Sequence, residues 1–314
     1  MTMMMLRFAI AAGPEIGLGH LRRMQVLARA ALAADFTVAL HVSAGAQYAA
    51  VADGLPPPIA VNDWYQLPAA EGLIADGEIF NADHFRAWRK NFAVMTAIDD
   101  TASRPLDVDL LVNPGLNADT VDYRHLSQAQ ILAGPQYGLI DPGFFELRQA
   151  RPSTARALVA FGASDDGRIA AAVATALLAV TPLEIDLVTS PLRAVAAAVR
   201  DVVALGGGRI TVHHGADMAA LMAQATVYCG AAGVTVTEAL AAGRAIVTAA
   251  IVDNQQANIS ALQKAGLAAF RHVDSAAMAA AVSAVCATEY QPPSTLQIGA
   301  EGAEKILAAI LAKR

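Results

Sequence analysis

A glycine-rich segment close to the N-terminus ends in a histidine. It reads Gly13-Pro-Glu-Ile-Gly17-Leu-Gly19-His20, and Arg23 follows three residues later. Glycines let a ligand approach the backbone closely, and the free N–H groups at the start of a helix attract anions. The imidazole of His20 could act as a base near neutral pH, although a histidine that only packs at the loop would give the same pattern. We take His20 as a candidate catalytic base and Gly17, Gly19 and Arg23 as candidate substrate-binding residues.

The same segment lacks the third glycine of the dinucleotide-binding fingerprint. Arg22 stands where the pattern Gly-x-Gly-x-x-Gly requires that glycine. The missing element argues against NAD as the ligand. The segment therefore predicts a site for another anionic group.

A second loop of small residues follows an expected strand in the second half of the chain. Gly233-Val234-Thr235 precedes Glu238, which lies in the first turns of an expected helix. The backbone of such a loop can hold a diphosphate at the helix N-terminus. The Glu238 carboxylate could accept hydrogen bonds from two ribose hydroxyls, or it could be a surface charge that the helix dipole favours. Taken alone, this motif leaves both interpretations open.

An amide-rich loop, Asp253-Asn254-Gln255-Gln256-Ala257-Asn258, follows the next expected strand. Amide side chains donate and accept hydrogen bonds, so Asn254, Gln255 and Asn258 could bind the hydroxyl and acetamido groups of a sugar. A polar turn that caps a helix would have a similar composition.

Alternating strands and helices would position these loops. The N-terminal part predicts a strand over Leu6–Ala12, a helix over His20–Ala34 and a strand over Phe36–Val42. The second half repeats this pattern, and its predicted elements include the strands Ala157–Phe161, Ile185–Thr189, Ile210–His213 and Ala245–Ala249 and the helices Arg168–Leu178 and Leu192–Val203. The pattern is weaker between Ala46 and Pro105. An α/β fold follows, with two open parallel sheets that bind ligands beyond the carboxyl ends of their strands.

The length of 314 residues is more than a single hydrophobic core usually supports. A polar stretch, Arg151-Pro152-Ser153, separates the two series of elements. We expect an N-terminal domain over residues 1–152 and a C-terminal, nucleotide-binding domain over residues 153–314. The last helix is a candidate for packing back on the N-terminal domain.

Composition excludes several classes of protein. The net charge of −6 argues against a nucleic-acid partner, because binding to phosphate backbones needs a basic surface. Two cysteines are too few for a disulfide framework or a cysteine metal site. We find no apolar run long enough to span a membrane and no convincing signal peptide, so a cytoplasmic location is expected.

Taken together, these motifs resemble a known family. The matching segments, in chain order, are Gly17-x-Gly19-His20-x-x-Arg23, Ile98-Asp99-Asp100, Val112-Asn113-Pro114-Gly115, Gly134–Ile140, Phe161-Gly162-Ala-Ser164-Asp165, Gly233-x-Thr235-x-x-Glu238 and Asp253-Asn254-Gln255. They resemble the UDP-sugar hydrolases of pseudaminic acid biosynthesis, which are similar to MurG-type glycosyltransferases. The resemblance covers most of the chain.

The resemblance implies a GT-B fold, in which two Rossmann-like domains with parallel sheets face each other across a cleft. It implies hydrolysis of UDP-2,4-diacetamido-2,4,6-trideoxy-β-L-altrose to UDP and the free sugar, a step toward the pseudaminic acid used in flagellin glycosylation. His20 would be the base that activates water, and Asn254 would help to position the sugar or that water. The other residues implied in substrate binding are Gly17, Gly19, Arg23, Gly162, Ser164, Gly233, Val234, Thr235, Glu238, Gln255 and Asn258. Neither metal nor cofactor is implied.

Two motifs of the family are absent. The family has Arg-x-Asp at the end of the first strand, where this chain has Ala9-Ile10-Ala11. It also has Asp-His-Tyr in the first domain, and the spacing from Asp99-Asp100 places that motif at Asp76-Gly77-Glu78. Two alternatives therefore stay open. One is a glycosyltransferase in which an acceptor hydroxyl replaces water, and the other is a non-catalytic nucleotide-sugar binding protein.

Overall fold

The computed structural model describes residues 3–13, 15–45, 54–150, 152, 154–288, 293, 296 and 298–314. The chain folds into two compact units, of which the first combines Met1–Leu139 with Gly299–Arg314 and the second is Ile140–Ile298. Two residues of the expected domain boundary, Arg151 and Ser153, lie outside the described residues, as does Pro14 of the first glycine-rich loop. The division between the units comes earlier in the chain than the expected boundary.

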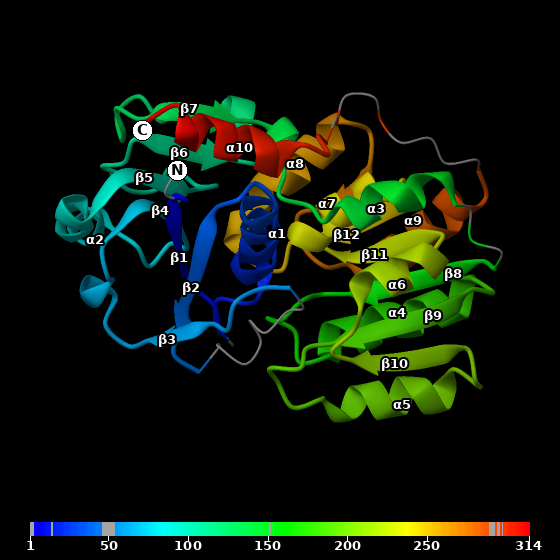
Figure 1. Cartoon of the computed structure of the whole chain (residues 1–314). Coiled ribbons are helices and arrows are strands. Elements are labelled where there is room, and N and C mark those ends of the chain that lie inside the picture. The colour runs from blue at the N-terminus through cyan, green and yellow to red at the C-terminus, as the bar shows by residue number, and fades with distance from the viewer. Residues whose placement is uncertain are drawn as a thin grey trace. The chain divides into compact units, whose positions relative to one another are not determined.

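The first unit is built on a parallel sheet of seven strands in the order β3-β2-β1-β4-β5-β6-β7 (Figure 1). Its elements are β1 (Met5–Ile10), α1 (Gly19–Ala33), β2 (Thr37–Ser43), β3 (Ile59–Val61), η2 (Trp64–Gln66), β4 (Ala70–Asp76), α2 (Ala82–Trp88), η3 (Arg89–Asn91), β5 (Phe92–Ile98), β6 (Leu110–Asn113), η4 (Ala118–Thr120), β7 (Gln130–Ala133), η5 (Pro135–Tyr137) and α10 (Gly302–Leu311). The 3₁₀ helices carry the label η. Strands β1 and β4 are neighbours although β2 and β3 separate them in the sequence.

The second unit contains a parallel sheet of six strands in the order β10-β9-β8-β11-β12-β13. Its elements are α3 (Pro142–Glu146), η6 (Leu147–Gln149), β8 (Arg156–Ala160), α4 (Arg168–Val180), β9 (Glu184–Thr189), α5 (Ala197–Leu205), β10 (Ile210–His214), α6 (Met218–Gln224), β11 (Val227–Ala231), α7 (Val234–Ala241), β12 (Ala245–Ala249), η7 (Asp253–Gln255), α8 (Gln256–Lys264), β13 (Ala268–Phe270) and α9 (Ser275–Cys286). Two Rossmann-like sheets confirm the α/β class.

Both faces of the first sheet are buried, as is usual for parallel sheets. On one face, Phe8 and Ile10 pack in a core with Leu27 of α1 and Ile306 of α10. On the other face, β4 and β5 pack against α2, where Trp88 is fully buried. An apolar layer on each side therefore holds the sheet in place and, with it, the loops that follow the strands.

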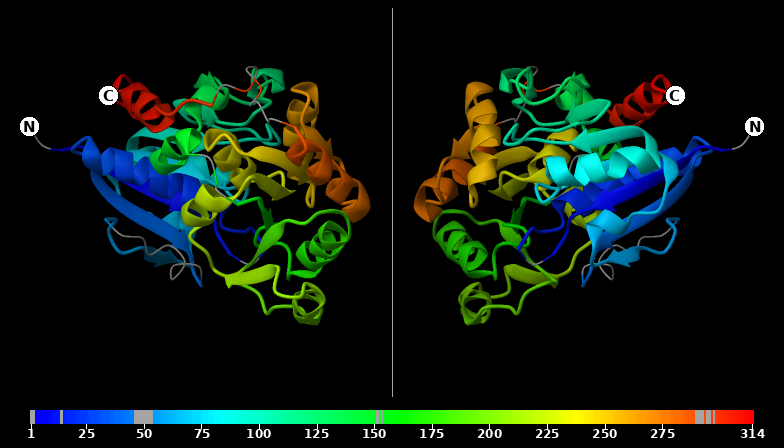
Figure 2. Two further views of the ribbon diagram at one scale, coloured as in Figure 1. Left: turned by 90° about the vertical axis from the view of Figure 1, so that its right-hand side faces the viewer. Right: turned by 90° about the vertical axis from the view of Figure 1, so that its left-hand side faces the viewer.

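The C-terminal helix α10 belongs to the first unit because it packs beside α1, and Figure 2 shows it in red near the blue N-terminal elements. Its first residue, Gly302, lies so close to the Gly138 carbonyl that a side-chain carbon would collide with it. Glycine at this position therefore permits the helix to dock.

The short elements α3 and η6 belong to the second unit because two arginines hold them there. The Nη1 and Nη2 atoms of Arg244 donate to the carbonyl oxygens of Ala150 and Leu147, at 2.8 and 3.2 Å. The Nε atom of Arg148 donates to the Ala241 carbonyl at 3.2 Å. These bonds join residues 147–150 to the last residue of α7 and to Arg244 beyond it, which places them in the second unit.

Several predicted elements agree with the structure to within two residues at each end, among them β1, α1, β2, β8, α4, β9, β10 and β12. Helix α5 begins at Ala197 rather than at Leu192, because residues before it form a turn in which Leu192 N donates to Ser190 Oγ at 3.1 Å. The weak region between Ala46 and Pro105 contains β3, β4, β5 and α2. No helix in the described part of the chain is both long and apolar enough to cross a membrane.

Candidate functional site

The first glycine-rich loop is a tight turn between β1 and α1. Gly13 and Gly17 exchange backbone hydrogen bonds, with N···O distances of 3.2 and 2.7 Å. Their φ angles of +152° and +89° lie in the region that favours glycine. The N-cap residue Leu18 makes no side-chain capping hydrogen bond to α1, which begins at Gly19 and places His20 beyond the carboxyl end of β1.

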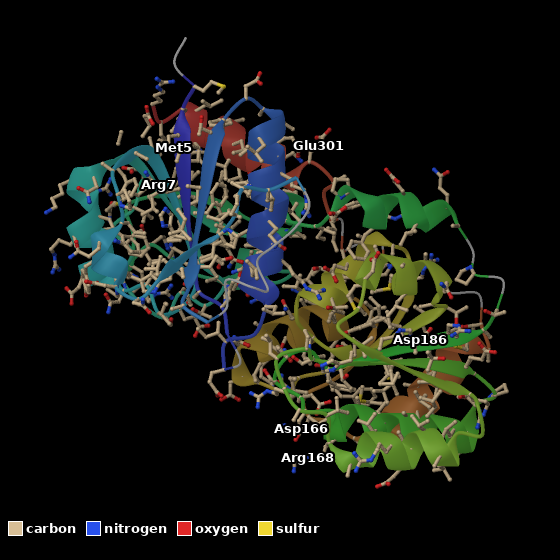
Figure 3. The ribbon with its side chains drawn as sticks, turned by 60° about the horizontal axis from the view of Figure 1, so that its bottom comes forward. Met5, Arg7, Asp166, Arg168, Asp186 and Glu301 are labelled. Atoms are coloured by element: carbon tan, nitrogen blue, oxygen red, sulfur yellow. The ribbon has the colours of Figure 1, made fainter. Side chains whose placement is uncertain are left out.

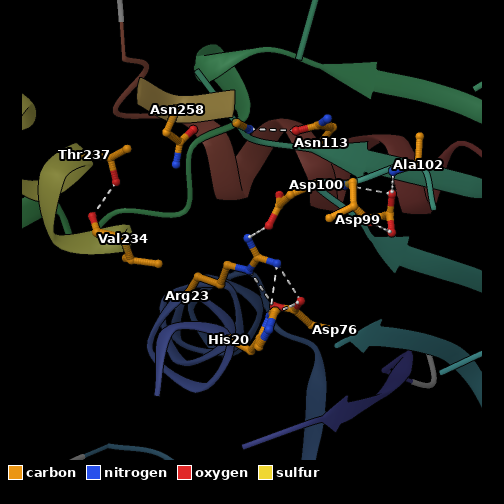
Figure 4. A network of polar contacts seen from close by, with 12 residues as sticks. His20, Arg23, Asp76, Asp99, Asp100, Ala102, Asn113, Val234, Thr237 and Asn258 are labelled. Atoms are coloured by element: carbon orange, nitrogen blue, oxygen red, sulfur yellow. Dashed lines mark hydrogen bonds and ion pairs between the residues drawn. The ribbon is translucent and has the colours of Figure 1, made fainter. Parts of the chain in front are cut away.

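His20 is paired with a buried carboxylate that is not among the site residues predicted from the sequence. Strand β4 ends at Asp76, whose side chain is fully buried, and its Oδ1 atom lies 2.8 Å from Nδ1 of His20 (Figure 4). An ionised carboxylate only accepts hydrogen bonds, so Nδ1 carries the proton and its N–H donates a hydrogen bond to Asp76. The lone pair of Nε2 is then available to accept a proton, and 20% of the His20 side chain is exposed.

Arg23 lies one helical turn after His20 on the same face of α1. Its Nε and Nη2 atoms each donate to one oxygen of Asp76, both at 2.6 Å. Burial alone would raise the pKa of Asp76, but the nearby charges of Arg23 and His20 and their hydrogen bonds outweigh burial and lower it to about 2. Asp76 therefore stays ionised at neutral pH.

Arg23 also binds a second carboxylate. Its Nη1 atom donates to Oδ2 of Asp100 at 2.6 Å. Burial would lower the pKa of Arg23, but the charges of Asp100 and Asp76 raise it above its ordinary value. Arg23 was expected to bind substrate, yet each of its three guanidinium nitrogens donates to a carboxylate of the protein. This arrangement suits a residue that positions Asp76 better than one that contacts a ligand.

The loop after β5 holds Asp100 in place. The preceding residue, Asp99, is buried and accepts hydrogen bonds from the backbone N–H groups of Thr101 and Ala102, at 3.2 and 2.7 Å (Figure 4). Its carboxylate also accepts from Nη1 of Arg104 at 2.8 Å. The loop conformation is thus fixed by Asp99, and its neighbour Asp100 is the carboxylate that binds Arg23.

The two sites at which the sequence departs from the resembled family lie against each other. Ala11 follows β1 and Gly77 follows β4, and the Ala11 N–H donates to the Asp76 carbonyl at 3.0 Å. Gly77 has a φ of +143°, and a Cβ atom added to it would collide with the Cβ of Ala11. Small residues at both positions therefore keep this edge of the sheet close-packed beside Asp76.

In the second unit, the loop Gly233-Val234-Thr235 forms the start of α7. Gly233 is the N-cap residue, and as a glycine it has no side chain with which to cap this end of the helix. The Asn258 side chain donates to the Ala232 carbonyl at 3.0 Å. Backbone N–H groups at the start of a helix attract anions, and this is the helix start that the sequence motif predicts to bind a diphosphate.

Two further predicted residues lie around the same loop. Gln255 lies near Gly233, because its Nε2 atom would be 3.5 Å from a Cβ added there. The Oε1 atom of Gln255 accepts from the Ile251 N–H at 3.0 Å. Glu238 is buried within α7. The structure thus brings Gln255 and Asn258 together at the start of α7, which carries Glu238 further along.

Asn254, Gly162 and Ser164 lie on other loops at the carboxyl edge of the second sheet. Asn254 is exposed in η7. Gly162, with a φ of +75°, and the exposed Ser164 follow β8.

The first turn of α4 is closed off by carboxylates of the protein. Both oxygens of Asp165 accept hydrogen bonds from the N–H groups of Ile169 and Ala170, at 3.1 and 3.0 Å. Asp166 and Arg168, labelled in Figure 3, form an ion pair at the same place. The start of α4 therefore offers less room to an anion than the start of α7.

Within the described ranges, no group of three or more histidine, cysteine, aspartate or glutamate side chains is arranged to hold a metal ion.

Comparison with known proteins gives structural matches only. No family model matches the sequence, and no curated protein matches it significantly. Among solved structures, the glycosyltransferase of kitacinnamycin matches with a TM-score of 0.61 and 15% identity, over 100% of this chain and 96% of that one. MurG of Acinetobacter baumannii matches with a TM-score of 0.61 and 14% identity, over 99% of this chain and 100% of that one.

The plant enzyme UGT89C1 of Arabidopsis thaliana, solved with UDP-L-rhamnose, matches with a TM-score of 0.65 and 12% identity, over 99% of this chain and 100% of that one. The chain has the GT-B fold. This finding confirms the fold that the sequence resemblance implied, and at these identities it establishes the fold alone.

Proposed function

We propose that this GT-B protein is an enzyme that takes the sugar from a UDP-sugar and passes it to a nucleophile activated by His20. The observation that carries the proposal is the 2.8 Å hydrogen bond between His20 Nδ1 and Asp76 Oδ1. Such a pair fixes the tautomer of a histidine and stabilises the imidazolium that forms when it accepts a proton.

In this mechanism, Nε2 of His20 removes a proton from the hydroxyl group or water that attacks. The oxygen of the nucleophile forms a bond to the anomeric carbon, and the bond from that carbon to the β-phosphate oxygen breaks. The electron pair of the broken bond leaves on UDP. Asp76 stabilises the positive charge that His20 has gained.

The second unit would bind the UDP part of the substrate. The N–H groups at the start of α7, over Gly233–Thr235, would bind the diphosphate and stabilise the charge that develops on it. Glu238 would accept hydrogen bonds from the ribose hydroxyls. Gln255 and Asn258 would hold the loop, and Asn254 would contact the sugar or the attacking water.

The finer proposal is a hydrolase, in which water is the nucleophile. It follows from the resemblance to the UDP-sugar hydrolases of pseudaminic acid biosynthesis, whose His20-containing motif is intact here. Asp76 adds support, because it stands where the spacing places the aspartate of the Asp-His-Tyr motif. Gly77 and Glu78 replace the other two residues of that motif.

A glycosyltransferase is the second candidate, and two observations favour it. Ile16 on the loop after β1 and Ile79 on the loop after β4 are 39% and 41% exposed, although both are large and apolar. These loops adjoin His20 and Asp76, so an apolar part of an acceptor would find contacts there. Replacement of the tyrosine by Glu78 also indicates that the sugar or the nucleophile differs from that of the hydrolases.

A non-catalytic binding protein would not need a histidine paired with a buried carboxylate. Keeping Asp76 and Arg23 ionised and buried carries a desolvation cost that a well-packed apolar pair would avoid. The intact pairing of His20 with Asp76 therefore favours an enzyme.

Release of UDP tests the proposal and separates its two forms. The wild type is incubated with UDP-2,4-diacetamido-2,4,6-trideoxy-β-L-altrose or with UDP-N-acetylglucosamine, first without acceptor and then with a panel of hydroxyl-bearing acceptors. Release from the altrose compound alone, without acceptor, supports the hydrolase. Release only in the presence of an acceptor supports the transferase, whereas failure to bind UDP or any donor would contradict both.

A further inference from the structure

Asp100 is a charged residue beside the candidate site to which the mechanism above gives no part. Its Oδ2 atom accepts the hydrogen bond from Arg23 Nη1 at 2.6 Å, and 38% of its side chain is exposed. Its Oδ1 atom is shielded from solvent and has no hydrogen-bond partner among the described residues. Among the described residues, the Asp100 side chain therefore contacts the site through Arg23 alone. Its effect on His20 would come from the negative charge that it places beside Arg23.

The position of Arg23 makes that charge matter. Oδ1 of Asp76 accepts hydrogen bonds from both His20 Nδ1 and Arg23 Nη2, at 2.8 and 2.6 Å. The Arg23 Nη2 atom also lies 3.2 Å from His20 Nδ1. A guanidinium this close would repel the imidazolium that forms when His20 accepts a proton. Without Asp100, the single negative charge of Asp76 would have to offset both the Arg23 guanidinium and the His20 imidazolium.

A count of formal charges shows what Asp100 contributes. With His20 neutral, the two carboxylates and Arg23 sum to −1, and proton uptake by His20 brings the cluster to zero. Without the charge of Asp100 the same step would take the cluster from zero to +1. A net positive charge is costly in a site that is largely buried, so loss of Asp100 would oppose the protonation of His20.

Other charged groups lie on the neighbouring loops and on α1. Glu15 lies on the loop before α1 and Glu78 on the loop after β4, and both are exposed to solvent, which screens their charges. Arg22 is the neighbouring cation on α1 and is partly exposed. Strands β1 and β2 and helix α10 contribute apolar side chains to the core against α1. Asp100, held by the buried Arg23, is therefore the additional anion whose charge reaches His20 through a fixed contact.

We propose that Asp100 is a positioning residue for the base: by neutralising Arg23 it leaves the charge of Asp76 available to stabilise the imidazolium that forms on His20. This inference rests on the proposed function, since it concerns the same histidine. It adds a residue that touches neither substrate nor base.

A titration of His20 by NMR tests this inference without any substrate. The protein contains seven histidines, and with histidine labelled on the ring nitrogens the His20 signals are identified by their loss in His20→Ala. The pH midpoint of its protonation is measured in wild type and in Asp100→Asn, which keeps the shape of the side chain and removes its charge. We expect the midpoint in Asp100→Asn to fall by about half a pH unit or more. Asp122→Asn, which removes an exposed aspartate paired with Arg124, is the matched control and should leave it unchanged.

Asp100→Glu keeps the charge, and its midpoint should stay close to that of the wild type. If Asp100→Asn shifts the His20 midpoint no more than Asp122→Asn does, the proposal is wrong and Asp100 only anchors Arg23. Should Asp100→Asn fail to fold, the His20 midpoint in Asp100→Glu tests the proposal by itself. A midpoint about half a pH unit or more below that of the wild type would contradict the charge-based role, because Asp100→Glu keeps the charge. Failure to bind UDP or any donor would overturn the proposed function while leaving the outcome of this titration unaffected.

Discussion

Asp76 at the end of β4 accepts hydrogen bonds from both Nε and Nη2 of Arg23, each at 2.6 Å. Arg23 lies one turn after His20 on α1. This bidentate pair links a helix and a strand through two residues that are 53 positions apart in the sequence. It sets the orientation of the carboxylate that binds His20. Any change to Arg23 should therefore affect stability as well as activity.

Arg23→Met should lower the free energy of unfolding by about 3–5 kcal/mol, because it leaves Asp76 as an unpaired buried charge. Urea denaturation measures this loss. Arg124→Met removes an arginine whose partner Asp122 is on the surface, and it should change the free energy by about 0.5 kcal/mol or less. Equal effects of the two substitutions would show that the Arg23–Asp76 pair is not a buried, stabilising contact.

The stability of the protein should depend on pH through Asp76. Its pKa falls from 3.8 to about 2 on folding, so the folded state binds the proton less readily than the unfolded state. The stabilisation that this carboxylate provides is complete above about pH 4 and is lost as the pH falls toward about 2. Denaturation curves over this range should show a steeper loss for wild type than for Asp76→Asn. Parallel curves would contradict a depressed pKa.

Glu238→Gln should weaken UDP binding about tenfold or more, because hydrogen bonds to a charged acceptor exceed those to a neutral amide in strength. Isothermal titration calorimetry with UDP measures the change. Glu146→Gln alters an exposed glutamate of α3 in the same unit and serves as the control. Unchanged affinity in Glu238→Gln would remove Glu238 from the proposed ribose site.

Gly77→Ala should destabilise the protein by about 1–3 kcal/mol, because the new methyl group meets Ala11 and the backbone φ of +143° disfavours a side chain. The double variant Ala11→Gly, Gly77→Ala removes the collision and leaves only the backbone strain. A double-mutant cycle should therefore show a coupling between the two sites of at least about 0.5 kcal/mol. Strict additivity would mean that Ala11 is not the obstacle.

Local patterns in the sequence were sufficient for many of the elements. The apolar run Ala245–Ala249 corresponds to β12 at both ends, and the glycines before His20 mark the turn into α1. The region that contains β4 and α2 gave no clear periodicity. Its strand Ala70–Asp76 has small residues at Ala70, Gly72 and Ala75, which weaken the apolar signal of a buried strand.

The candidate site depends on contacts that local patterns do not contain. Asp76 meets His20 only because β4 pairs with β1 rather than with the strand before it in the sequence. The position of Arg23 in the motif predicts that it binds an anionic substrate. In the structure, its guanidinium binds two anionic side chains of the protein itself, Asp76 and Asp100. The spacing from Asp99-Asp100 to Asp76 was the one sequence signal that could have identified the partner of His20.

The most direct test of the central claim compares wild type with His20→Gln in one experiment that measures both donor turnover and UDP affinity. Gln keeps a polar side chain but cannot serve as a base, so we predict that UDP release from the preferred donor falls by about 10²-fold or more, with little change in the Kd for UDP. Asp76→Asn should reduce turnover in the same direction. Undiminished turnover in His20→Gln would contradict the assignment of His20 as the base and, with it, the proposed mechanism.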